Sequence, residues 1–269
     1  MSRAPLLPDR PRPLVFAHRG CSSLAPENTL AAFTLARDLG APGIELDIHA
    51  TADGRLVVAH DDTLVRVAPP DNNGGGKKLE DLRYEEIARV DAGSFFDPRW
   101  AAERPPLLET VLETFCPGMY VDIELKSRKT RDDPLPGLLA EKLRALGGTI
   151  SAAVTVSSFN PFCVRAFKRA WRRAAAPGGL RDIPGAVIYC ADPEVPWILR
   201  RGFGRVLAGC DYLKPIHRQV NPLTPRWAAL EGRPLVPWTV DTPALAERLV
   251  RRGCAGVITN RPQDMPWKR

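Results

Sequence analysis

The 269-residue sequence contains no run of about 18 apolar residues, the length that a transmembrane helix needs. Its start, MSRAPLLPDRPRP, carries Arg and Pro where a secretory signal would carry its apolar segment. It also lacks a basic stripe interleaved with aromatic residues, so no nucleic-acid partner is expected. These absences predict a cytoplasmic protein without stable membrane anchoring.

The six cysteines show none of the spacings that mark a metal site or a redox pair. None lies in a C-x-x-C pair, and none has zinc-like spacing to a histidine. Free thiols spread through a chain of this length favour a reducing compartment. Cys21 follows a polar turn and is a weak candidate nucleophile, because nothing in the sequence singles it out for thiolate stabilisation.

The composition is that of an ordinary globular domain with a basic surface. Apolar residues make up 44% and charged residues 26% of the chain, and 38 Lys and Arg against 31 Asp and Glu give a net charge of +7. Such a charge attracts phosphates, nucleic acids or anionic lipids, but the arginines are scattered, which favours a solvated surface. We expect a single domain over residues 1–269, with a core at about 14–262.

Short apolar strands alternate with helical periodicity along the whole chain. This pattern predicts about eight strand–helix units, which is the number in a TIM-type (β/α)8 barrel of roughly 250 residues. An open doubly wound sheet is the alternative, and it is less favoured because no G-x-G-x-x-G follows the first strand. The expected strands are residues 13–17, 43–49, 119–126, 152–159, 185–190, 210–215, 234–240 and 255–260.

The segments between these strands give further expectations. A tight turn leads from the second strand into an apolar run at 55–60, and helices are expected over 79–90 and 193–202, among others. Asn160 followed by Pro is typical of a helix start, with Asn160 as the N-cap. The Gly- and Asn-rich segment 72–78 is expected to be a surface loop that contributes to the lid of a pocket.

Polar side chains gather where several of these strands end. Glu45, Asp47 and His49 alternate with apolar residues and therefore share one face of their strand, and Glu124 follows on the next one. In a barrel, the carboxyl ends of the strands carry the chemistry. Carboxylate oxygens suit Mg²⁺ or Ca²⁺ rather than zinc. A buried cluster paired with Lys or Arg is the alternative, but three carboxylates near histidines favour a metal site.

Two histidines and two cations complete this group. His18 and His60, at the ends of neighbouring elements, have the chemistry for general acid–base catalysis near neutral pH. Arg19 and Lys126 have the charge and donors to hold a phosphate, and they also have the charge to balance the carboxylates. His49 is a further candidate ligand or orienting group.

Taken in order, the motifs of the chain resemble those of the glycerophosphodiester phosphodiesterase family. Each motif alone is weak, but the ordered set runs from residue 14 to residue 262 and is specific. The matching segments are His18-Arg19-Gly20, Pro26-Glu27-Asn28-Thr29, Glu45-Leu46-Asp47, His60-Asp61, Glu124-Leu125-Lys126, Ser158-Phe159, Trp238-Thr239-Val240 and Gly256-Val257-Ile258-Thr259.

The resemblance implies a metal-dependent hydrolase that releases an alcohol and glycerol 3-phosphate from a small glycerophosphodiester. It implies that a divalent metal ion, Mg²⁺ or Ca²⁺, is held by the three carboxylates. It also makes the histidines the acid–base pair, gives Arg19 and Lys126 to the phosphate and places Trp238 against the glycerol moiety. Glu27 and Asn28 would support the site by ordering the first loop.

The chain departs from the family pattern in two places. Asp122 stands where the family often has Asn, and this carboxylate would strengthen metal binding or alter its charge preference. Asn260 stands where the family commonly has Asp, and a structural role is expected for it.

The sequence leaves several questions of activity open. The nucleophile is either water or the neighbouring glycerol hydroxyl of the substrate, and the oligomeric state is undetermined. A lysophospholipase D-type reaction on lysophospholipids is the first alternative, opposed by the absence of an amphipathic or lipid-anchoring segment. A barrel that only binds glycerophosphodiesters and a nucleic-acid phosphodiesterase are weaker alternatives.

Overall fold

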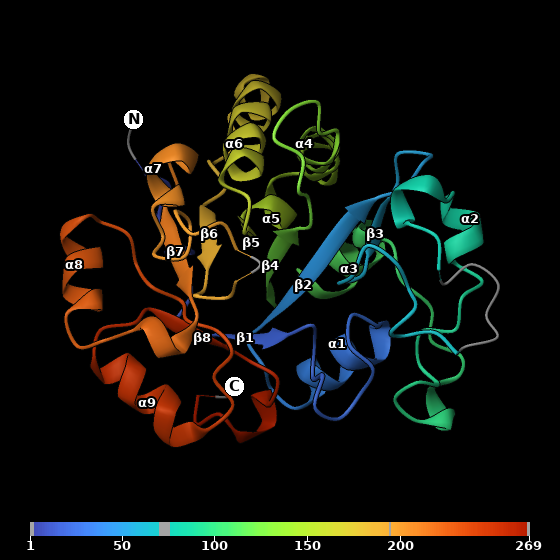
Figure 1. Cartoon of the computed structure of the whole chain (residues 1–269), viewed down its shortest axis with the longest axis horizontal. Coiled ribbons are helices and arrows are strands. Elements are labelled where there is room, and N and C mark those ends of the chain that lie inside the picture. Colours follow the sequence, from blue (N-terminus) through green and yellow to red (C-terminus); the bar gives the residue numbers. More distant parts are fainter. Residues whose placement is uncertain (1–2, 70–75, 194, 268–269) are drawn as a thin grey trace.

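The apolar runs of the sequence form parallel strands that curl around a common axis, with the helices outside them (Figure 1). The computed structural model describes residues 3–69, 76–193 and 195–267. Seven parallel strands follow the order β7-β6-β5-β4-β2-β1-β8. Their bounds are β1 (Leu14–His18), β2 (Gly43–Ala50), β4 (Tyr120–Leu125), β5 (Val154–Ser158), β6 (Gly185–Tyr189), β7 (Tyr212–Pro215) and β8 (Gly256–Thr259).

Residues 234–240 close the gap between β7 and β8. The amide of Leu213 donates to Pro234, and that of Val236 donates back to Leu213, at 3.0 and 2.9 Å. On the other side, the amide of Ile258 donates to the carbonyl of Pro237 at 3.0 Å. Pro234 and Pro237 have no N–H, so the segment cannot form a continuous ladder. The strand expected over 234–240 is thus an irregular extended segment, and the TIM-type barrel is confirmed.

The run at 55–60 forms the short strand β3 (Leu56–Val58), which pairs antiparallel with the end of β2. In the described part of the chain, no helix has the length and apolar character that a membrane span requires. The helices are α1 (Leu30–Asp38), α2 (Tyr84–Ile87), α3 (Leu108–Phe115), α4 (Leu135–Leu146), α5 (Gly148–Ser151), α6 (Pro161–Ala175), α7 (Gly204–Ala208), α8 (Thr224–Leu230) and α9 (Pro243–Arg251).

Local sequence signals predicted some helices well and others poorly. Helix α6 begins as expected, since the side chain of Asn160 accepts a hydrogen bond from the amide of Phe162 at 3.0 Å. The helix expected over 193–202 is wrong, because Pro196 and Gly202, with φ of 75°, interrupt it and α7 begins only at Gly204. The single helix expected over 79–90 is confirmed only in part.

In place of that helix, a 3-10 turn at Leu79–Asp81 precedes the short α2. The lid expected over 72–78 falls mainly on residues 72–75, which lie outside the described residues.

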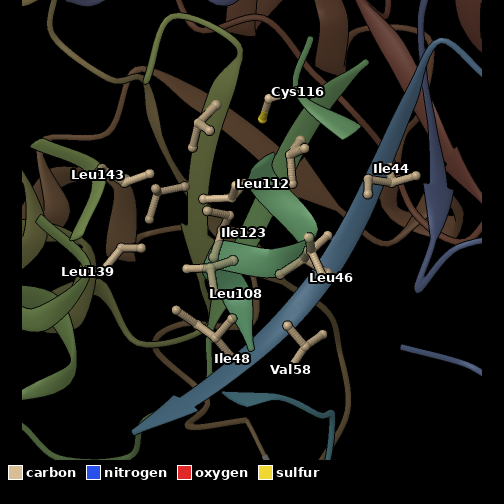
Figure 2. Packing of buried hydrophobic residues seen from close by; sticks show 14 of the residues in the cluster. Ile44, Leu46, Ile48, Val58, Leu108, Leu112, Cys116, Ile123, Leu139 and Leu143 are labelled. Atoms are coloured by element: carbon tan, nitrogen blue, oxygen red, sulfur yellow. The ribbon is translucent and has the colours of Figure 1, made fainter. Parts of the chain in front are cut away.

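The two faces of β2 serve different purposes. Ile44, Leu46 and Ile48 point out of the barrel into the apolar layer beneath α3 and α4, where they pack with residues such as Leu112 and Leu139 (Figure 2). Because side chains alternate along a strand, the residues between them point into the barrel. Burial of the outer face therefore fixes which side chains reach the interior.

The amino-terminal segment packs against the barrel end opposite the strand carboxyl ends. Leu6 and Leu7 are buried in one cluster with Leu14 and Tyr120, which lie at the beginning of β1 and β4. The amide of Ala4 donates to Asp211 Oδ1 at 3.0 Å. The Pro-rich start therefore covers the amino end of the barrel.

A Gly43→Ala substitution should destabilise the fold by about 1–3 kcal/mol, because its Cβ would overpack the barrel interior. That Cβ would lie 2.1 Å from the ring of Tyr120. The ring cannot easily retreat, since its hydroxyl accepts from the amide of Val15 at 2.7 Å and donates to the Val15 carbonyl at 3.1 Å. Urea unfolding measures the loss.

Gly137→Ala is the matched control for this test. Nothing lies within 4 Å of the new Cβ, and Gly137 is inside α4. Ala is the better helix former, so the free energy of unfolding should stay equal or rise by up to about 1 kcal/mol. Equal stability of the Gly43→Ala variant and the unmodified protein would contradict the proposed constraint.

Candidate active site

The strand register brings the polar side chains to the same end of the barrel. His18 is paired with Glu45 across β1 and β2, and Asp47 with Glu124 across β2 and β4. Partners in a parallel ladder point to the same face, so all four side chains belong to the barrel interior at the carboxyl ends of the strands. The sequence predicted this gathering, and the structure shows it.

Glu45, Asp47 and Glu124 form a compact carboxylate cluster. One oxygen atom from each lies within 4.8 Å of the other two, and all three side chains are buried. Asp47 Oδ1 is buried without a hydrogen-bond partner. Buried oxygen acceptors at this spacing fit a hard divalent cation such as Mg²⁺ or Ca²⁺. In the described residues this is also the one group of acidic, His or Cys side chains found with a metal-compatible spacing.

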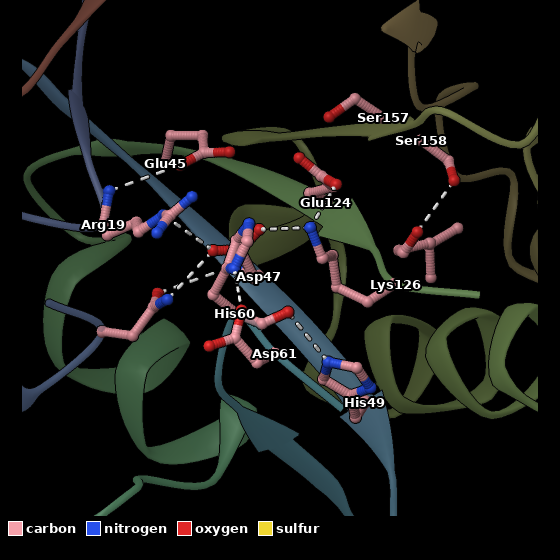
Figure 3. Close-up of polar contacts among 12 residues, drawn as sticks. Arg19, Glu45, Asp47, His49, His60, Asp61, Glu124, Lys126, Ser157 and Ser158 are labelled. Carbon is pink, nitrogen blue, oxygen red and sulfur yellow. Dashed lines mark hydrogen bonds and ion pairs between the residues drawn. The ribbon is translucent and has the colours of Figure 1, made fainter. Parts of the chain in front are cut away.

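Two cations flank Asp47 (Figure 3). Arg19 Nε lies 3.4 Å from Asp47 Oδ2, and its guanidinium also donates to Glu27 at 3.0 Å. Lys126 Nζ lies 2.9 Å from Glu124 Oε1 and 3.6 Å from Asp47 Oδ1. The expected charge balancing of the carboxylates is therefore present.

The two carboxylates of β2 titrate in opposite directions. Burial, together with the charge of Asp47, raises the pKa of Glu45 to about 8. Burial opposes ionisation of Asp47 too, but the charges of Lys126 and Arg19 hold its pKa well below its usual range. Asn28 reinforces this by donating to Asp47 Oδ2 at 2.9 Å. Asp47 is thus ionised, whereas Glu45 carries a proton near neutral pH.

A chain of hydrogen bonds fixes the ring of His18. Asp241 Oδ2 accepts from the side-chain amide of Asn260 at 2.9 Å, and Asp241 Oδ1 accepts from the Asn260 backbone at 2.8 Å. The amide oxygen of Asn260 must then face His18 Nδ1, which lies 2.6 Å away. This assigns the proton to Nδ1 and leaves the Nε2 lone pair free on the side of Glu45, at 3.9 Å.

The environment of His18 favours its neutral form. Burial and the charge of Arg19 lower the pKa of His18 to about 4. Its imidazole is therefore uncharged near neutral pH and able to accept a proton.

His60 is held differently, through charged partners. His60 Nδ1 lies 2.6 Å from Asp61 Oδ1, and Arg66 donates to both Asp61 and Glu27 at 2.7 Å. Because Glu27 also contacts Arg19, this network connects the two histidine-bearing loops. His60 lies beside Asp47 of the cluster (Figure 3).

Asp122 does not join the carboxylate cluster, contrary to the expectation that it would strengthen metal binding. It lies level with Glu45 in the register, and Lys214 Nζ donates to it at 2.6 Å. The hydroxyls of Tyr212 and Thr155 also donate to it, each at 2.8 Å. These donors occupy its oxygens, so Asp122 neutralises Lys214 inside the barrel.

His49 and Trp238, two further residues that the sequence singled out, are each held by a hydrogen bond to a backbone carbonyl. His49 bonds through Nε2 to the carbonyl of His60 at 3.2 Å, which is an orienting contact. The indole of Trp238 donates to the Lys214 carbonyl at 3.0 Å and stands edge-on to Phe159, with ring centroids 5.6 Å apart.

The six cysteines are all buried and free, as expected. Burial raises the pKa of the Cys21 thiol, which disfavours a nucleophilic role.

The sequence reading undervalued Asn260 and missed the roles of Asp241, Lys214 and Arg66. Asn260 and Lys214 each lie at the carboxyl end of a strand, and this position could have indicated that they belong to the site.

A cleft of about 460 Å³ opens beside His18, and its lining also includes Arg19 and Asn260.

Comparison with known proteins agrees with the geometry. The Glycerophosphoryl diester phosphodiesterase family profile matches residues 18–175. A glycerophosphodiester phosphodiesterase of Caldanaerobacter subterraneus is 35% identical over 94% of this chain and 96% of its own length. One from Bacillus subtilis is 31% identical over 96% of this chain and 86% of its own length.

Solved structures give the same result. A phosphodiesterase of Oleispira antarctica, determined with its product sn-glycerol-3-phosphate, has a TM-score of 0.70 at 27% identity, covering 93% of this chain and 94% of the other. A glycerophosphodiester phosphodiesterase of Agrobacterium tumefaciens has a TM-score of 0.71 at 25% identity, covering 93% and 96%. Since the profile covers more than half of the chain and the Caldanaerobacter enzyme aligns with nearly all of it, this protein belongs to the glycerophosphoryl diester phosphodiesterase family.

Proposed function

We propose that this protein hydrolyses small glycerophosphodiesters to an alcohol and glycerol 3-phosphate, with a divalent cation held by Glu45, Asp47 and Glu124. The observation that carries the proposal is the buried carboxylate cluster, in which Asp47 Oδ1 has no hydrogen-bond partner and Asp47 is flanked by two cationic side chains. A phosphodiester is an anion, and this mouth offers it positive charge and a proton acceptor together.

The cluster and its cations would bind the phosphate. A bound divalent cation supplies Lewis-acid stabilisation of the negative charge that develops on the phosphate oxygens. Arg19 and Lys126 add donors for the same oxygens, as the resemblance implied. Burial alone would lower the pKa of Lys126, but Glu124 and Asp47 raise it, so the ammonium stays charged for this role.

The histidines would divide the proton transfers between them. His18 is neutral, with Nε2 free, and takes a proton from the nucleophile. His60, paired through Nδ1 with Asp61, gives a proton to the leaving alkoxide. Asn260 and Asp241 would position His18. Trp238 would pack against the glycerol moiety from the segment between β7 and β8.

The direct test is release of glycerol 3-phosphate from glycerophosphocholine by the purified protein, with Mg²⁺, with Ca²⁺ and with a chelator. We expect release that depends on the metal and stops in the chelator, because the carboxylates need a cation to hold the phosphate. Folded protein that releases no product with either metal would reject the activity.

Replacement of either histidine should slow catalysis. His18→Ala and His60→Ala should each lower turnover by about 10²–10⁴-fold and leave the fold intact, because each removes one proton-transfer group. Steady-state rates on glycerophosphocholine, with circular dichroism as the folding check, measure this. Turnover near that of the unmodified protein would remove the histidine from the mechanism.

Two further variants serve as controls for the histidine test. His217→Ala removes an imidazole that lies outside the cluster and should leave turnover unchanged. Asn260→Ala keeps His18 but frees its ring from the 2.6 Å bond, so we expect a smaller loss than in His18→Ala. A full loss in both Asn260→Ala and His18→Ala would mean that Asn260 does more than orient the ring.

Metal affinity should depend on pH through Glu45, whose pKa is about 8. Below that pH a metal ion must displace the proton, so apparent affinity should rise about tenfold per pH unit up to about pH 8 and then level off. Calorimetric titration of Mg²⁺ from about pH 6 to about pH 9 measures this. Glu45→Gln mimics the protonated form and should bind weakly at every pH. An unchanged titration in this variant would reject Glu45 as a ligand.

A further inference from the structure

A group of large apolar side chains is exposed on α7, on α8 and on the loop that precedes α7. The fold leaves each of them more than half exposed. We call this group the apolar face. Its members are Trp197, Ile198, Phe203, Val206, Leu223 and Leu230.

The degree of exposure is unusual for such side chains. Trp197 is 78% exposed, Val206 71% and Leu230 90%. Isolated exposed apolar residues are common on proteins, whereas a group of them marks an interaction site. Phe203 and Val206 are three residues apart, and Leu223 and Leu230 are seven apart, so each pair lies along one side of its helix.

Arg205 connects the two halves of the apolar face. Its guanidinium lies 5.6 Å from the ring centroid of Phe203 and 4.4 Å from that of Trp227 on α8. It also bonds to Glu231 at 3.1 Å, just beyond the end of α8. The stack links Phe203, before α7, to Trp227 on α8, and Figure 1 shows α8 at the left edge and α7 at the upper left.

The apolar face begins at the same end of the barrel as the candidate active site. Trp197 lies in the connection that follows the carboxyl end of β6, and Leu223 in the connection that follows β7. His18 lies at the carboxyl end of β1. A partner bound to this part of the apolar face would therefore lie beside the open end of the barrel.

The charge of residues 195–233, the segment that carries the face, is positive. Arg201 and Arg226 are exposed, and Arg226 is three residues after Leu223 and four before Leu230, so it shares their side of α8. Residues 195–233 contain only two carboxylates, both of which are already paired. Asp211 is buried against Lys168 at 2.5 Å, and Glu231 binds Arg205 and Arg233.

We propose that the apolar face docks the barrel onto a lipid surface that carries anionic headgroups. Exposed Trp, Phe and Leu side chains insert at the level of the headgroups, while Arg201 and Arg226 reach the lipid phosphates. A second copy of the chain fits less well, because self-docking brings these arginines against their own copies. The contact is peripheral and depends on salt, in keeping with the expected lack of stable anchoring.

This inference rests on the surface alone and does not require the proposed hydrolysis. The test is co-sedimentation of the full chain with vesicles of phosphatidylcholine, with and without phosphatidylglycerol. We expect binding to the mixed vesicles, little binding to pure phosphatidylcholine, and release at high salt. The vesicles contain only diacyl phospholipids, and binding is measured without turnover of glycerophosphocholine, so a failure here is distinguishable from a failure of the activity.

Two pairs of variants separate the apolar and the charged contributions. Trp197→Ser with Leu230→Ser should weaken binding to the mixed vesicles about tenfold or more, because two exposed side chains lose their burial in lipid. Arg201→Gln with Arg226→Gln should weaken it through lost attraction to the headgroups. Val65→Ser and Arg173→Gln, exposed on other parts of the surface, are the matched controls and should bind as the unmodified protein does.

Three results would overturn the proposal. The first is that the unmodified protein does not bind the mixed vesicles. The second is that the variant with both Trp197→Ser and Leu230→Ser binds them as strongly as the unmodified protein does. The third is that light scattering shows a dimer of the unmodified protein and a monomer of this variant. The last result would assign the face to a second copy. Thermal unfolding of each variant confirms that it is folded.

Discussion

Repulsion among three buried carboxylates is the constraint around which the mouth of the barrel is arranged. Glu45, Asp47 and Glu124 are too close together and too well buried to be ionised without compensation. Arg19 and Lys126 keep Asp47 ionised, and Glu45 retains a proton to a pKa of about 8. Under the proposed function, a divalent cation held there would displace the proton of Glu45 and take over its part of this compensation.

The supporting hydrogen bonds come from loops far apart in the chain. Asn260, after β8, holds His18 at the end of β1, and Asn28 holds Asp47. Arg66 links Asp61 to Glu27, so the loops that carry the two histidines are tied together. Because these partners fix the rings and the carboxylates before a substrate arrives, less order has to be created on binding.

Local patterns predicted a large part of this structure. The alternation around Glu45 and Asp47 placed them on one face of β2, and Asn160 marked the beginning of α6. Prediction failed where backbone constraints competed with periodicity. Pro196 and Gly202 interrupt the helical pattern of 193–202, and Pro234 and Pro237 turn the strand expected over 234–240 into an irregular segment that still closes the barrel. In the second case neighbouring strands supply the pairing that the segment cannot form by itself.

The sequence by itself determined the eight-fold strand pattern, the family and the carboxylates that share a face, because alternation along a strand is a local property. Only the tertiary structure decided which carboxylates act together. Asp122 and Glu124 point the same way, but their different levels in the barrel give the first to Lys214 and the second to the cluster. Folding likewise decided that His18 pairs with Asn260 and that Arg205 links α7 to α8. In both cases the residues are far apart in the sequence, and no local pattern predicts their contact.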